Sequence, residues 1–167
     1  MCVLLIFAGH VTTTNLIGNG ILALLQNPSQ LELLRKSPSL LDSAVEEIIR
    51  SNDSVQANTR TALESYQLGV TQIKKGDRLS FNLAATNRDP AQFTNADKFN
   101  IARSEGRHVG LGFGIHFCLG AALARMEGQA GIGSVVKVMP NLSLGDQELE
   151  WRPNPVLRGL KELNVTF

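Results

Sequence analysis

One cysteine of this chain stands in a setting that suits metal chemistry or a nucleophile. Cys118 follows the glycine-rich run GFGIHF at residues 112–117 and precedes a stretch that favours a helix. The thiolate is the form of cysteine that binds metals. A helix N-terminus favours that anion through its dipole and its unpaired backbone N–H groups. The run therefore predicts a thiolate ligand for a metal such as iron.

Other chemistry for the same residues is less well supported. His108 and His116 could join Cys118 around a zinc ion, but structural zinc takes about four ligands and no second cysteine lies nearby. The glycines at 110, 112 and 114 suggest a phosphate-binding loop. However, Ile115 occupies the last glycine position of that motif, and no Lys-Ser/Thr pair follows. A cysteine near histidines also suits a hydrolase nucleophile, which stays open as a distant alternative.

Length, charge and cysteine content limit the classes of function. The 167 residues suffice for one domain with a hydrophobic core, and we expect a single region over residues 1–167. The formal net charge of +1 indicates no affinity for nucleic acid or for an acidic membrane surface. The two cysteines, Cys2 and Cys118, are too few for a disulfide framework and fit a reducing compartment. We therefore expect a cytoplasmic protein with neither nucleic acid nor membrane as a partner.

The apolar start of the chain has two interpretations. Residues 1–9 are similar to the apolar part of a signal peptide, but no Lys or Arg occurs before Arg35. The apolar run is also too short to cross a bilayer. We therefore favour a core helix that is apolar on most of its faces.

Apolar spacing predicts three helices before the first strand. They cover residues 3–25, residues 29–36 and a segment that begins at Pro38. Glu47 and Arg50 lie three residues apart on the third helix. Taken alone, such a pair is a solvated ion pair that contributes a few tenths of a kcal/mol.

The remaining segments predict small sheets, a long irregular stretch and one more helix. Residues 59–83 favour short strands, with a turn at 75–77 between strands 70–73 and 78–81. Residues 87–107 show no period, and such stretches are usually functional. A helix is predicted after Cys118 to about Met139, and packing must hold its glycine-rich second half. Residues 142–167 favour short strands and turns. The expected apolar face of the last helix consists of Leu119, Ala122, Leu123, Met126 and Ala130.

Three motifs together resemble those of the cytochrome P450 haem-thiolate monooxygenases, in their soluble bacterial branch. The segment AGHVTT at 8–13 is similar to the oxygen-binding groove of the family's central helix. EIIR at 47–50 is similar to its E-x-x-R helix, and GFGIHFCLG at 112–120 to its haem-binding loop. The resemblance continues through NRDP at 87–90 and PVLRGL at 155–160. It implies a mainly α fold with small β-sheets (α+β), which is the C-terminal part of the P450 fold from the middle of the central helix. The N-terminal substrate-pocket portion would be absent.

On the proximal side, the resemblance implies haem b as the cofactor and Cys118 as its metal ligand. Electron donation from the thiolate favours O–O cleavage. Three residues would face the haem propionates, and glycines would let the backbone approach the haem and the sulfur. Leu111 stands where the family's loop usually carries phenylalanine. The cofactor-binding residues implied in this way are Cys118, Arg60, His108, His116, Gly112, Phe113, Gly114, Gly120 and Leu111.

On the distal side, the resemblance implies that Thr12 helps to deliver protons to dioxygen. Ala8 and Gly9 would leave room for the ligand, and Thr13 belongs to the same motif. Val11 departs from the family pattern, because an acidic residue usually precedes the threonine. A valine side chain cannot transfer a proton.

The resemblance also implies a structural cluster and an activity. Glu47, Arg50 and Arg103 would form a buried ion-pair cluster behind the haem loop. The activity would be hydroxylation of a C–H bond of a small organic substrate. The resemblance weakly favours a polyketide or fatty-acyl substrate. It would use O2 and two electrons from a separate ferredoxin or flavodoxin. The alternatives are a non-catalytic or haem-binding remnant of such an enzyme and, distantly, a cysteine hydrolase.

Overall fold

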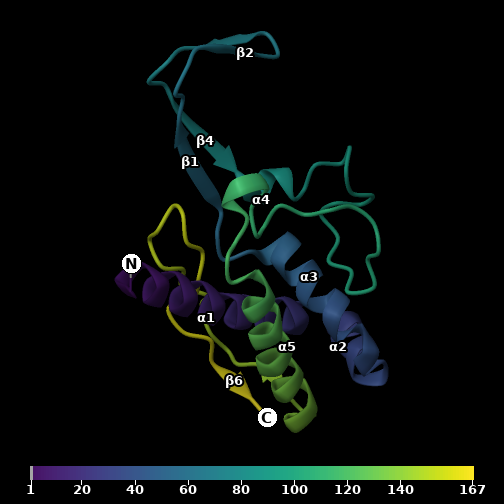
Figure 1. The fold of residues 1–167 in the computed structure, drawn as a ribbon. Helices are drawn as coiled ribbons and strands as arrows, with labels where there is room; N and C mark the ends of the chain where they lie inside the picture. Colours follow the sequence, from purple (N-terminus) through teal and green to yellow (C-terminus); the bar gives the residue numbers. More distant parts are fainter. Residues whose placement is uncertain (1) are drawn as a thin grey trace.

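The computed structural model describes residues 2–167 and is mainly helical with small sheets, as predicted (Figure 1). Met1, the first residue of the apolar run, lies outside the described residues. The helices are α1 (Cys2–Gln26), α2 (Pro28–Lys36), α3 (Leu41–Asn52), α4 (Leu83–Thr86) and α5 (Ala121–Val138), with 3-10 turns η1 (Pro38–Leu40) and η2 (Gly114–His116). The strands are β1 (Ala57–Thr61), β2 (Tyr66–Leu68), β3 (Thr71–Ile73), β4 (Arg78–Asn82), β5 (Ser143–Leu144) and β6 (Val165–Thr166).

The core lies where α1, α3 and α5 pack against one another (Figure 1). Leu24 from α1, Ile48 from α3 and Ile132 from α5 are almost fully buried in one cluster. Glycines allow these helices to approach closely, because a Cβ on Gly20 would lie only 2.8 Å from Ile132 Cδ1. A Cβ on Gly128 would likewise lie 3.2 Å from Val45 Cγ1. The glycine-rich half of α5 is therefore held by packing, as the sequence required.

The predicted apolar face of α5 is wrong. Its large members are exposed: Leu119 by 91%, Leu123 by 57% and Met126 by 63%. The buried face consists of Ala121, Gly128, Ile132 and Val136. Small residues on that face let the backbone of α5 lie close to α1 and α3, so the packed face is the less apolar one in sequence. Hydrophobic spacing identified the helix but not the side that packs.

The short strands form three separate antiparallel pairs. β1 pairs with β4, β2 with β3, and β5 with β6. A turn occurs at residues 75–77, but the predicted pairing across it is wrong, because β3 and β4 pair with other strands. The backbone N–H of Ala62 donates to the Asp77 carbonyl at 2.9 Å, which draws the turn to the end of β1 instead. The β2–β3 hairpin projects away from the helices (Figure 1).

Helix α1 is long and apolar enough, by length and composition, to cross a membrane. Its first half, from Val3 to Phe7, is exposed, whereas Leu16, Leu22 and Leu24 in its second half are buried against other elements. The second half therefore has the surroundings of a core helix in a globular fold.

Candidate functional site

A pocket of about 230 Å³ brings together residues from distant segments of the chain. Ala8, Thr12 and Thr13 line it from α1, while His116 and Cys118 line it from the glycine-rich loop. More than 100 residues separate the two groups in sequence. The fold thus places the threonine motif of α1 and the cysteine at one site.

Backbone geometry shapes the loop that presents Cys118. Gly112 and Gly114 have φ values of 77° and 68°, which residues with a Cβ rarely adopt. The N–H of Cys118 donates to the carbonyl of Leu111 at 2.9 Å, and its carbonyl accepts from Ala121 N–H at 3.2 Å. Cys118 therefore lies one turn before α5, whose N-cap is Gly120, and its thiol is free and exposed.

The residues around this thiol fit a flat apolar group that carries a metal. Phe113 is 70% exposed and Ile115 is 98% exposed. No neighbouring protein atom lies within 4 Å of the position that a Cβ on Gly114 or Gly120 would take. Open space at these two glycines, beside an exposed free thiol, lets a planar group such as a haem approach the loop and its sulfur.

Donors for acidic groups lie at the edge of the pocket. His116 lines it directly. Arg60 is exposed on β1, two residues beyond the pocket-lining Asn58, and alternation along a strand places both on one face. Among residues 2–167, its guanidinium donates only to the neighbouring Thr59 carbonyl, at 2.8 Å.

The hydroxyl of Thr12 is oriented by its own helix. Its Oγ1 donates to the carbonyl of Ala8 at 2.5 Å, so its lone pairs remain to accept a hydrogen bond in the pocket. Gly9 is exposed, and it does not line the pocket. A Cβ there would meet no neighbouring atom within 4 Å.

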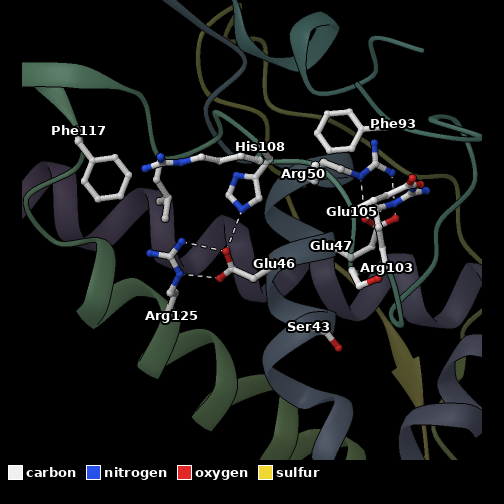
Figure 2. Close-up of a pocket in the computed structure, with 14 residues that line it drawn as sticks. Ser43, Glu46, Glu47, Arg50, Phe93, Arg103, Glu105, His108, Phe117 and Arg125 are labelled. Carbon is white, nitrogen blue, oxygen red and sulfur yellow. Dashed lines mark hydrogen bonds and ion pairs between the residues drawn. The ribbon is translucent and has the colours of Figure 1, made fainter. Parts of the chain in front are cut away.

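The structure does not bring His108 to the Cys118 pocket. Its Nε2 lies 3.0 Å from Glu46 Oε2, and its Nδ1 accepts from Gly110 N–H at 3.2 Å (Figure 2). The ring of His108 lines a second pocket together with Glu46 and Arg125. His108 thus does not line the Cys118 pocket, and its role toward the haem propionates stays a prediction.

Glu47, Arg50 and Arg103 meet in a buried cluster (Figure 2). Arg50 Nε lies 2.7 Å from Glu47 Oε2, and Arg103 Nε lies 3.1 Å from the same oxygen. The three side chains are only 1–6% exposed. Arg50 also donates to the Asn87 carbonyl at 2.7 Å, and Glu47 accepts from Asn100 N–H at 2.9 Å. The cluster therefore ties α3 to the irregular stretch 87–107.

Glu46, which binds His108 and Arg125, was not predicted from the sequence. Its carboxylate accepts from Arg125 Nε at 2.6 Å and from Arg125 Nη2 at 2.9 Å, besides its contact with His108 (Figure 2). His108 precedes Cys118 and Arg125 follows it, so one carboxylate on α3 holds both ends of the cysteine loop. No local motif could have revealed this, because the partners lie 62 and 79 residues away.

These contacts predict a pH-dependent contribution to stability. Burial raises the pKa of Glu46, but hydrogen bonds from His108 and Arg125 outweigh it and lower the pKa from 4.5 to about 2. A lowered pKa stabilises the folded chain above pH 4.5, and this stability is lost as pH falls toward about 2.

We expect Glu46→Gln to lower the unfolding free energy at pH 7 by about 1 kcal/mol, since partial exposure screens the pair. The loss should shrink as the pH falls from about 5 to about 3, because the parent carboxylate then becomes protonated in the unfolded chain. Denaturant titrations at several pH values would measure it. If the unfolding free energies of the parent and Glu46→Gln differed by the same amount at every pH, the pairing of Glu46 with His108 and Arg125 would be contradicted.

A thiol-bearing loop that faces a helix hydroxyl on this fold is the arrangement of a haem-thiolate protein. The family model for cytochrome P450 matches residues 34–139, and the chain belongs to the cytochrome P450 family. Membership implies haem as the cofactor, in agreement with the fit of the Cys118 pocket.

Individual relatives match nearly the whole chain. The biotin biosynthesis cytochrome P450 of Bacillus subtilis is 46% identical over 99% of this chain, and the polyketide biosynthesis cytochrome P450 PksS of the same organism is 42% identical over 100%. A crystal structure of P450BioI in complex with an acyl carrier protein ligated to hexadec-9Z-enoic acid superposes with a TM-score of 0.97. It is 45% identical over 100% of this chain and 44% of its own. The chain spans about 42% of the length of the two Bacillus relatives.

Proposed function

We propose that residues 1–167 form a single region that carries the haem-thiolate part of a cytochrome P450 monooxygenase. The enzyme hydroxylates a C–H bond of a small organic substrate with O2 and two electrons from a separate ferredoxin or flavodoxin. The observation that carries this proposal is that Cys118 and Thr12 line the same pocket. Bound haem supplies the activation of O2.

The residues of the chain take distinct roles in this proposal. Cys118 would bind the haem iron through its sulfur, because its thiol is free and exposed and lines the pocket. His116 and Arg60 would pair with the haem carboxylates, since His116 lines the pocket and Arg60 lies beside it on β1. Thr12 accepts a hydrogen bond from a donor in the pocket, because its own proton is given to Ala8. Glu47, Arg50 and Arg103 hold the irregular stretch against α3.

The comparisons support a fatty-acyl or polyketide substrate. One relative is named for biotin biosynthesis and another for polyketide biosynthesis. The solved P450BioI structure holds an acyl carrier protein that carries a C16 chain. We propose that this enzyme acts on an acyl chain of that kind in the cytoplasm.

A carbon monoxide difference spectrum tests the proposal. The chain with haem, once reduced, should show the red-shifted Soret band of a thiolate-bound haem, because Cys118 donates the axial sulfur. Cys118→Ser should lose that shift completely. Cys2→Ser is the matched control, because Cys2 is also free and exposed but lies outside the pocket.

Two results would count against the assignment. A shifted band that survives in Cys118→Ser would show that another group ligates the iron. Lack of the shift in the parent chain would remove the haem-thiolate proposal altogether.

A non-catalytic haem-binding remnant is the second candidate. The apolar residues Val3 to Phe7 of α1 are exposed directly before the pocket-lining Ala8, and a closed distal site would require them to be covered. Turnover of an acyl substrate with NADPH, ferredoxin and its reductase separates the two. Substrate oxidation supports the enzyme, whereas haem binding without product supports the remnant.

A further inference from the structure

Asp53 is a buried carboxyl group to which the proposed function assigns no role. It follows α3 directly and is only 5% exposed. Its Oδ1 accepts from Val55 N–H at 3.2 Å, but its Oδ2 is buried without a hydrogen-bond partner among the described residues. Burial raises the pKa of Asp53 from 3.8 to about 7, against the lowering effect of the Val55 and Ser54 backbone N–H groups.

This carboxyl group belongs to the same pocket as the proposed axial ligand. Asp53 lines the pocket together with Cys118 and Thr12. The loop toward Cys118 passes directly over it, because a Cβ on Gly110 would lie 2.6 Å from Asp53 Oδ2. A charge at this position would act on a bound haem through protein rather than through bulk water, and such interactions are strong.

We propose that Asp53 is a proton-exchanging group of the haem pocket, and that it makes the reduction potential of the bound haem depend on pH near neutrality. The inference rests on the proposed haem site. An external one-electron reductant reduces the haem iron, which lowers its positive charge. The Asp53 carboxylate then loses electrostatic stabilisation and takes one proton from solvent to become the neutral acid. One electron and one proton are thus taken up together.

Other charged or titratable groups near Asp53 could also make the reduction potential depend on pH. His116 and Cys118 are the titratable side chains that line the same pocket from the loop, and none of the pocket-lining residues of α1, β1 or α5 is titratable. Arg88 donates to the Ser51 carbonyl, and the backbone N–H of Arg158 donates to the Ser54 carbonyl at 2.8 Å. The arginines keep their charge across neutral pH, and the Cys118 sulfur is occupied by iron in the proposed site. His116 and the carboxylates of the haem are therefore the competing sources of a pH effect.

The first experiment needs no haem. A raised pKa means that the folded chain holds the Asp53 proton more tightly, so stability falls as pH rises from about 4 to about 7. Asp53→Asn removes this loss and keeps the shape of the side chain. The melting temperature of the parent should therefore fall relative to Asp53→Asn over that pH range. Asp146→Asn, at an exposed acid, is the matched control and should follow the parent.

The second experiment measures the haem itself. The midpoint potential of the haem-loaded chain should fall as pH rises from about 6 to about 8 and should be nearly constant in Asp53→Asn. It should also be more positive in Asp53→Asn at the upper pH, since a negative charge favours the oxidised iron.

The possible outcomes separate this inference from the proposed function. A slope that survives in Asp53→Asn assigns the effect to another group, such as His116 or a haem carboxylate, and overturns the role of Asp53. A flat potential in the haem-loaded parent, or a parent melting curve that follows Asp53→Asn at every pH, also overturns it. A parent chain that binds no haem but shows the expected melting difference contradicts the proposed function instead, and with it the coupling to haem.

Discussion

Replacing Glu47 by glutamine is expected to lower the free energy of unfolding by about 3–5 kcal/mol. The side chain is 1% exposed and accepts from both Arg50 and Arg103, whose positive charges would remain buried without a counter-charge. It also accepts from Asn100 N–H, so the irregular stretch would lose an anchor. Urea denaturation followed by circular dichroism measures the loss. The chain without haem suffices, because every contact lies within the protein.

Glu32→Gln provides a matched control for this prediction. Glu32 and Arg35 have the same three-residue spacing on α2 and an N–O distance of 2.7 Å, but Glu32 is 53% exposed. An exposed pair of this kind contributes less than about 1 kcal/mol. Similar losses for Glu47→Gln and Glu32→Gln would show that burial does not set the strength of the cluster.

Gly110→Ala is expected to destabilise the chain by about 1–3 kcal/mol, as overpacking of a filled site does. The added Cβ would lie 2.6 Å from both Asp53 Oδ2 and Ile49 Cγ2, and 3.0 Å from the Ile49 carbonyl oxygen. The backbone oxygen of α3 cannot move aside, so the cysteine loop must shift. Thermal or urea unfolding of the haem-free chain would measure the cost.

Gly18→Ala is the control for this substitution. No neighbouring atom lies within 4 Å of a Cβ at Gly18, and the residue is inside α1. Alanine there should stabilise the chain by about 0.5–1 kcal/mol, because glycine is the poorer helix former. A stable Gly110→Ala variant would contradict the close packing of loop and helix.

Local patterns predicted the elements of the fold well and their packing poorly. The predicted helices agree closely with α1, α2, α3 and α5, because apolar spacing and proline positions act within a few residues. The packed face of α5 and the pairing of β3 and β4 were wrong. Both depend on partners from distant segments, about which a local pattern carries no information.

The sequence alone determined that this chain has a cysteine in a glycine-rich loop, an E-x-x-R helix and a threonine motif, in the order of the cytochrome P450 family. Glycine spacing and helix signals are local properties, so they can be read without coordinates. Only the tertiary structure decided which side chains meet. It joined Cys118 with Thr12, turned His108 toward Glu46 and buried Asp53 beside Gly110. Long-range packing determines how deeply each side chain is buried. Burial in turn determines whether the pKa of an acidic side chain keeps its ordinary value or moves toward neutral pH.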